Sequence, residues 1–128
     1  KLTDLRIALD LTEEWAKLDN GSSLLTGVVI ARSEFAQEHP AAIEAFLEGY
    51  ADSVSYVNSN TADAAQLIGN YGIVDAAVAE KALPYCNITC VTGSDMKTQL
   101  SGYLAVLHEQ NPESVGGSLP NDDFYYGA

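Results

Sequence analysis

The sequence has 128 residues, 47% of them hydrophobic, which is enough apolar material for the packed core of one ordinary domain. Its 18 acidic and 6 basic residues give a formal net charge of −12, and this charge repels phosphate backbones and anionic membrane surfaces. We therefore expect no nucleic-acid partner. The longest strongly apolar run, residues 24–31, is far shorter than the roughly 20 residues of a membrane-spanning helix.

Two segments near the N-terminus predict β-strands. Residues 5–9 are short and apolar, and residues 24–31 are longer and rich in β-branched side chains. The longer segment does not alternate apolar with polar residues, which is typical of a strand covered on both faces in a mostly parallel sheet. Within the sequence only residues 5–9 and 88–91 are available as its neighbours. We therefore expect most of the sheet to lie in protein that this chain does not contain.

From residue 33 onward the sequence predicts helices. Capping and terminating residues mark a short turn from Ser33 to Glu38, a long helix that begins at Pro40, a helix from Thr61 that Gly72 ends, one from Asp75 to Leu83, and a last one from Thr92 or Ser94 to Asn111. The long helix and the last helix each carry an apolar stripe. We expect these side chains of the two stripes to be mostly buried: Ile43, Phe46, Leu47, Tyr50, Val54, Leu100, Tyr103 and Leu104.

The histidines do not indicate catalysis. His39 precedes a proline and His108 lies near a helix end, and neither is part of a motif that combines a base with a Ser or Cys nucleophile. No Asp-x-Asp-x-Asp-Gly calcium loop is present either. We expect neither enzymatic activity nor a metal or cofactor.

The two cysteines leave two interpretations open. Cys86 and Cys90 have no second ligand pair at zinc-site spacing. An extended segment between them would place their Cα atoms about 13 Å apart, too far for a disulfide. Pro84 and Asn87 make a bend plausible, so the alternatives are two free, largely buried thiols or a local disulfide.

Several landmarks run in order along nearly the whole chain. They are residues 9–15 (Leu-Asp-Leu-Thr-Glu-Glu-Trp), 28–40, 46–56, 64–73, 82–88, 111–120 and 122–126 (Asp-Asp-Phe-Tyr-Tyr). In this order they resemble the C-terminal part of bacterial ABC-transporter substrate-binding proteins of the nitrate, sulfonate, taurine and thiamine-precursor type.

The resemblance implies an α/β fold, a helix-rich fragment that forms the C-terminal portion of a two-lobed, type II periplasmic-binding-protein-like protein with few short strands and about five helices. Residues 1–23 would end the second lobe and cross over, and residues 24–128 would complete the first lobe as a single partial domain. Because the sequence begins at Lys1 without a secretion segment, we expect the N-terminal part of the parent protein to be absent. The implied function is the extracytoplasmic solute-binding component of a bacterial ABC importer, which delivers a small molecule to a membrane permease.

Ligands of open α/β proteins bind at the carboxyl ends of strands, so the predicted ligand residues flank the two predicted strands. In this interpretation a carboxylate suits a cationic ligand group, hydroxyls supply hydrogen bonds, and an indole forms an apolar wall. These residues are Asp10, Thr12, Glu13, Trp15, Ser22 and Ser23. The alternative interpretation is structural: Asp10 or Thr12 caps a short helix, and Trp15 packs into the core.

Two other classes of protein remain. A small acidic helical interaction domain would explain the acidic helices without a transport role. An enzyme domain with a doubly wound sheet would explain residues 24–31, but the sequence lacks a phosphate-binding glycine loop and a nucleophile motif. As a fragment of a solute-binding protein, the isolated chain is expected to self-associate, because residues 24–31 and one face of the helices have lost the sheet that they would cover.

Overall fold

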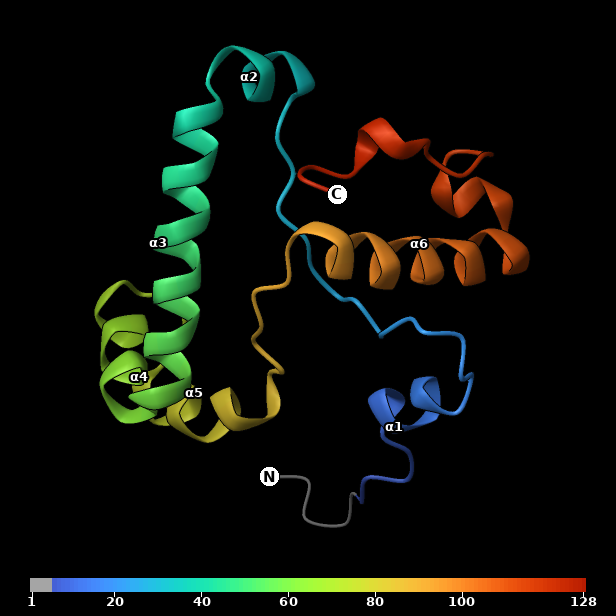
Figure 1. The fold of residues 1–128 in the computed structure, drawn as a ribbon. Helices are drawn as coiled ribbons and strands as arrows, with labels where there is room; N and C mark the ends of the chain where they lie inside the picture. The colour runs from blue at the N-terminus through green and yellow to red at the C-terminus, as the bar shows by residue number, and fades with distance from the viewer. Residues whose placement is uncertain (1–5) are drawn as a thin grey trace. The chain divides into compact units, whose positions relative to one another are not determined.

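The computed structural model describes residues 6–128, and within this range every regular element is helical. The elements are α1 (Leu11–Ala16), α2 (Ser33–Glu38), α3 (Pro40–Ser59), α4 (Thr61–Asn70), α5 (Ala76–Ala82), η1 (Leu83–Tyr85), α6 (Gly93–Gln110), η2 (Pro112–Val115) and η3 (Asp122–Phe124), of which the three η elements are short 3-10 helices (Figure 1).

The chain divides into two compact units. One is continuous and spans Ile30–Cys90; we call it the continuous unit. The other, the split unit, combines the described residues up to Val29 with Val91–Ala128. The lobe boundary expected after residue 23 stays a prediction.

In the continuous unit, small residues allow the helices to pack closely. α4 and α5 lie side by side near the C-terminal end of α3 (Figure 1). A Cβ atom built on Gly69 of α4 would lie only 2.9 Å from the Cβ atom of Ala76 in α5. Ala64 and Ala65 of α4 and Ala79 of α5 are buried, with at most 3% of their surface exposed. The core of this unit is therefore made of alanines rather than large apolar side chains.

The predicted ends of these helices are largely confirmed. Pro40 is the first residue of α3, and Asp75 caps α5 by accepting a hydrogen bond from the Ala77 backbone nitrogen at 2.9 Å. Gly72 follows α4 with a φ of 67°, the left-handed conformation expected of a glycine that ends a helix. Ser33 is the first residue of α2 rather than its cap, which is Arg32.

In the split unit, the C-terminal tail folds back along α6. Asn111 ends α6, and its side chain accepts a hydrogen bond from the Glu113 backbone nitrogen at 3.3 Å, which starts η2. Farther along, Lys97 of α6 forms an ion pair with Asp122 at 2.9 Å. Tyr125, next to that pair, is only 7% exposed and is the one buried residue of the described part of this unit.

The α/β fold class was the wrong prediction. Residues 6–9, 24–31 and 88–91 form no strand, and Leu5 lies outside the described residues. A strand is stable only beside hydrogen-bonded neighbours, and no described segment pairs with residues 24–31. A type II periplasmic-binding-protein-like fold with its strands is therefore replaced by a helical architecture.

The predicted burial of the apolar stripes was wrong for two of the eight residues and holds in part for the other six. Phe46 and Tyr50 of α3 remain 47% and 36% exposed. The other six predicted core residues are half-buried: Ile43, Leu47, Val54, Leu100, Tyr103 and Leu104. The periodicity located the apolar faces correctly, but each face has too few neighbours within its own unit to cover it.

Candidate functional site

Asp10 lies at the start of α1 and acts as its cap. Its Oδ1 atom accepts hydrogen bonds from the backbone nitrogens of Thr12 at 2.8 Å and Glu13 at 3.3 Å. These donors are among the backbone groups that the first turn of a helix leaves without partners. The capping interpretation is thus correct for Asp10. Its carboxylate is also exposed, so capping does not remove it from solvent.

Trp15 and Ser22 are brought together by a reversal of the chain after α1. The Trp15 indole Nε1 donates a hydrogen bond to the Ser22 Oγ at 2.9 Å. Left-handed backbone at Asp19 (φ 47°) and Gly21 (φ 73°) turns the chain back. Asn20 stabilises this turn, because its Oδ1 accepts hydrogen bonds from the Ser22 backbone nitrogen at 3.0 Å and the Ser22 hydroxyl at 2.5 Å.

α6 provides the other side of this contact. The rings of Trp15 and Tyr103 have centroids 5.1 Å apart and are tilted by 39°. A Cβ atom on Gly102 would lie 2.7 Å from the Ser22 Cβ, so only glycine allows this approach of helix and loop. We call Trp15, Asn20, Ser22, Gly102 and Tyr103 the Trp15 cluster.

The structure therefore joins some of the predicted ligand residues and not others. Trp15 and Ser22 touch, and both are half-buried. Thr12 and Glu13 are exposed in the first turn of α1, whereas Ser23 is half-buried. In the part of the chain that the structure describes, no hydrogen bond links the side chains of Asp10, Thr12, Glu13 or Ser23 to the cluster. The complete set of ligand residues stays a prediction.

Sequence reasoning missed three members of the cluster. Asn20 and Gly21 form an Asn-Gly pair, which is a strong turn signal and could have located the chain reversal. Tyr103 was assigned to the core stripe of the last helix, and it does contact Trp15. Nothing in the sequence marks Gly102 as the point where Ser22 approaches.

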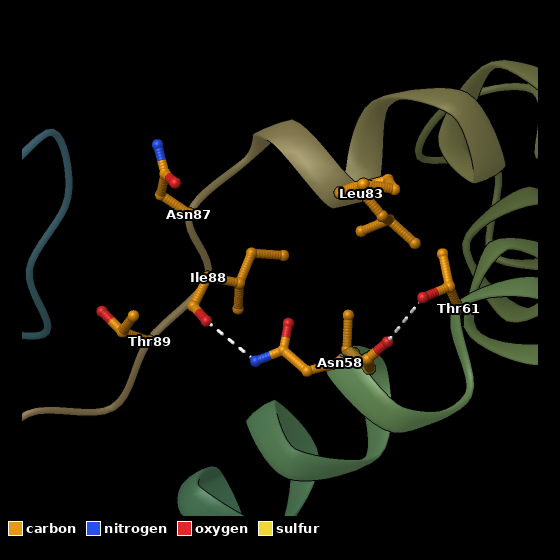
Figure 2. Close-up of a pocket in the computed structure, with 8 residues that line it drawn as sticks. Asn58, Thr61, Leu83, Asn87, Ile88 and Thr89 are labelled. Atoms are coloured by element: carbon orange, nitrogen blue, oxygen red, sulfur yellow. Dashed lines mark hydrogen bonds between the residues drawn. The ribbon is translucent and has the colours of Figure 1, made fainter. Parts of the chain in front are cut away.

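A separate hollow of about 260 Å³ lies in the continuous unit (Figure 2). Its lining combines apolar and amide side chains: Val57, Asn58, Thr61, Leu83, Pro84, Asn87, Ile88 and Thr89. The Asn58 amide donates to the Ile88 carbonyl at 3.0 Å, and the Thr61 hydroxyl donates to the Val57 carbonyl at 3.4 Å. The Asn87 side chain points away from the hollow (Figure 2). The Asn58 bond thus fastens the loop to α3, and the Thr61 bond joins the start of α4 to α3.

Both cysteines are free thiols, so the disulfide alternative was wrong. Cys86 is exposed rather than largely buried, and its thiol donates a hydrogen bond to the Ala82 carbonyl at 3.3 Å. Cys90 is half-buried. The predicted bend occurs at Asn87, where φ is 50°.

Other chemistry in the described residues is limited. Across residues 6–128, no three His, Cys, Asp or Glu side chains gather in a group that could hold a metal ion. The helices in this range include none that combines the length and apolar character needed to cross a membrane.

Burial raises the pKa of the Tyr125 phenol above its ordinary value of 10.0, an effect that Lys97 opposes and Asp122 reinforces.

Comparisons of the chain with protein families, curated proteins and solved structures find no match.

Proposed function

We propose that this chain is part of the solute-binding component of a bacterial ABC importer, which captures a small molecule outside the cytoplasm and delivers it to a membrane permease. The proposal starts from the order of landmarks along the sequence, from residues 9–15 to residues 122–126. It assigns no catalytic step to the chain, and the ligand is held only by non-covalent contacts.

The observation that carries the proposal is the Trp15 cluster. It joins an indole, a phenol and a hydroxyl at one place in the split unit, and the exposed carboxylate of Asp10 lies at the start of the helix that carries the indole. Small-molecule sites commonly combine aromatic walls with a few polar groups that fix orientation. This is the combination that the predicted ligand residues require.

The exposed extended segment gives additional support. Residues 24–31 follow directly after the cluster, and Val28, Val29 and Ile30 are 60%, 57% and 83% exposed. An extended run of β-branched residues with exposed side chains is suited to packing against further protein. A solute-binding component whose site is completed by other protein would need such a surface.

The direct test is a ligand screen on the protein as its gene encodes it, with thermal unfolding as the readout. A ligand at about a hundred times its Kd stabilises the folded state by about 2.7 kcal/mol, which shifts the transition visibly. Amino acids, sulfonates, polyamines and pyrimidines supply the compounds. If no compound raised the unfolding temperature, and no permease or ATPase gene lay beside this one, the proposal would fail.

Variants of Asp10 must distinguish ligand binding from helix capping, because in this proposal the Asp10 carboxylate has both roles. Asp10→Ala would remove the cap as well as the charge. Asp10→Asn keeps a good capping side chain and removes only the charge. For a cationic ligand, calorimetry should show affinity reduced by about ten- to a hundredfold in Asp10→Asn. Asp63→Asn, an exposed carboxylate in the first turn of α4, is the matched control and should bind as the wild type does.

A second candidate is a small acidic helical interaction domain. The exposed aromatic residues Phe46, Tyr50 and Tyr56 on α3 favour it, because aromatic side chains are enriched at protein interfaces. The two candidates differ in what Phe46→Ser would do. It should leave small-molecule binding intact if the chain is a solute binder, and it should weaken capture of a protein partner if the chain is an interaction domain.

A further inference from the structure

The loop after α1 contains the sequence's single Asn-Gly pair, Asn20 and Gly21. Both residues are exposed. A Cβ atom built on Gly21 would have nothing within 4 Å, so the space beside its α-carbon is open. Among the described residues, no backbone carbonyl accepts a hydrogen bond from the Gly21 peptide nitrogen. No such bond therefore has to break before this nitrogen reacts with the side chain that precedes it.

Two donors converge on the Asn20 Oδ1 atom. The Ser22 backbone nitrogen lies 3.0 Å away and the Ser22 Oγ 2.5 Å away. Since a backbone N–H can only donate, the atom that faces it must be the carbonyl oxygen of the amide and not its nitrogen. Two hydrogen bonds to this oxygen withdraw electrons from Cγ and would stabilise negative charge on the oxygen.

Ser22 is itself held in position. The Trp15 indole donates to its Oγ at 2.9 Å, and a hydroxyl that accepts a hydrogen bond becomes a better donor. The close approach of Gly102 fixes the Ser22 Cβ from the other side. The donors on Asn20 are therefore preorganised by residues outside the loop.

We propose that Asn20 is a site of spontaneous deamidation, promoted by a hydrogen-bond relay from Trp15 through Ser22. The Gly21 backbone nitrogen, after loss of its proton to hydroxide, attacks the Asn20 Cγ. The resulting oxyanion on Oδ1 is stabilised by the two Ser22 donors. The Cγ–Nδ2 bond then breaks, ammonia leaves with a proton from water, and a cyclic imide remains. Water opens the imide at either carbonyl to give aspartate or isoaspartate.

The modification places a new negative charge beside Ser22, within the Trp15 cluster. The amide is neutral and the product carboxylate is negatively charged, so the electrostatic environment of Ser22 and of the Trp15 indole that donates to it changes. The proposal does not depend on the solute-binding function. If that function holds, deamidation alters the charge at one edge of the ligand site with time.

Peptide mapping by mass spectrometry tests the proposal on the intact chain incubated at mildly alkaline pH. Asn20 should convert faster than Asn70 and Asn121, which are followed by Tyr71 and Asp122, and faster than the same pair in a synthetic peptide of residues 18–24. The rate should rise with pH, and unfolding the wild-type chain in urea should slow it to the peptide rate. A folded-state rate equal to or below the peptide rate overturns the proposal, because the hydrogen bonds would then protect Asn20.

Variants distinguish the effect of the hydrogen-bond relay from the intrinsic reactivity of the Asn20-Gly21 pair. Ser22→Ala removes the hydroxyl donor and should slow conversion of Asn20 by about tenfold. Trp15→Phe should slow it by a smaller factor, since it removes only the donor to that hydroxyl. Ser23→Ala is the matched control and should convert at the wild-type rate. Circular dichroism verifies that each variant is folded. Equal rates in folded wild type, Ser22→Ala and Trp15→Phe overturn the relay.

Discussion

Asp75 is a residue at which a single hydrogen bond governs the start of a helix. Its Oδ1 accepts from the Ala77 backbone nitrogen at 2.9 Å. Asp75→Ala should lower the free energy of unfolding of the continuous unit by about 1 kcal/mol, because it leaves that donor without its partner. Urea denaturation followed by circular dichroism measures the change. Asp75→Asn should stay within a few tenths of a kcal/mol of the wild type, and an Ala variant as stable as the Asn variant would contradict the capping role.

Tyr125 makes the stability of the split unit depend on pH. Burial raises its pKa in the folded state above the ordinary 10.0, against the effect of Lys97 and with that of Asp122. The folded state therefore favours the neutral phenol, so its stabilising contribution is complete below pH 10 and is lost as pH rises through the higher folded-state pKa. Denaturation at a series of pH values should show a fall above pH 10 that is smaller in Tyr125→Phe. Tyr71→Phe, at an 80% exposed position, should fall as the wild type does.

At the scale of elements, the contact between α4 and α5 depends on the lack of a side chain at Gly69. The nearest atom to an added methyl group would be the Ala76 Cβ at 2.9 Å, with the Ala76 backbone nitrogen at 3.2 Å. Gly69→Ala should therefore destabilise the continuous unit by about 1–3 kcal/mol, an overpacking cost larger than the gain in helix propensity. Gly49→Ala, in open space on α3 of the same unit, should instead stabilise it by about 0.5–1 kcal/mol. Matched denaturation curves check both signs, and a stabilising Gly69→Ala would show that α5 moves freely.

The helix ends could be predicted from the sequence, whereas the described residues of the predicted strands, 6–9, 24–31 and 88–91, form no strand. The two kinds of prediction differ in how far along the chain the contacts reach. Pro40, Gly72 and Asp75 act on neighbours within a few residues, so their roles are readable from local chemistry. A strand at residues 24–31 needs a partner that is distant in sequence, and β-branched composition alone supplies none.

The contacts of the candidate site likewise include some that the sequence could predict and some that it could not. The capping role of Asp10 was predictable because Thr12 and Glu13 are its immediate neighbours. The approach of Gly102 to Ser22 was not, because the two residues are far apart in the sequence and their contact depends on how α6 packs. Contacts made by local hydrogen bonds could thus be predicted from the sequence, and contacts that depend on helix packing could not.

At the scale of the whole molecule, the amount of exposed surface is unusual. The chain has a mass of 13.6 kDa and exposes 9877 Å². Two compact units of half this mass, wholly separate from each other, would together expose roughly 7,900 Å². The excess therefore arises within the units, which agrees with the small number of buried residues in the range 6–128: Ala64, Ala65, Ala79 and Tyr125.

We expect the isolated chain to associate as its concentration rises, because association buries part of this apolar surface. Light scattering at increasing concentration should report a growing mean mass, and a dye that fluoresces on apolar surfaces should bind. Phe46→Ser and Leu67→Ser, at positions 47% and 45% exposed, should reduce both signals. A monodisperse monomer with little dye binding at high concentration would contradict this expectation.

The continuity of one unit and the interruption of the other set an order of events during synthesis. Ile30–Cys90 is complete as soon as its own residues have left the ribosome, whereas the split unit must wait for Val91–Ala128. At roughly 5–20 residues per second, Trp15 and Ser22 spend seconds in a nascent chain before Gly102 and Tyr103 exist. Pulse proteolysis of a released chain that ends at residue 100 should find α3 to α5 protected and the loop after α1 open to cleavage. The loop after α1 is thus translated before the continuous unit and folded after it.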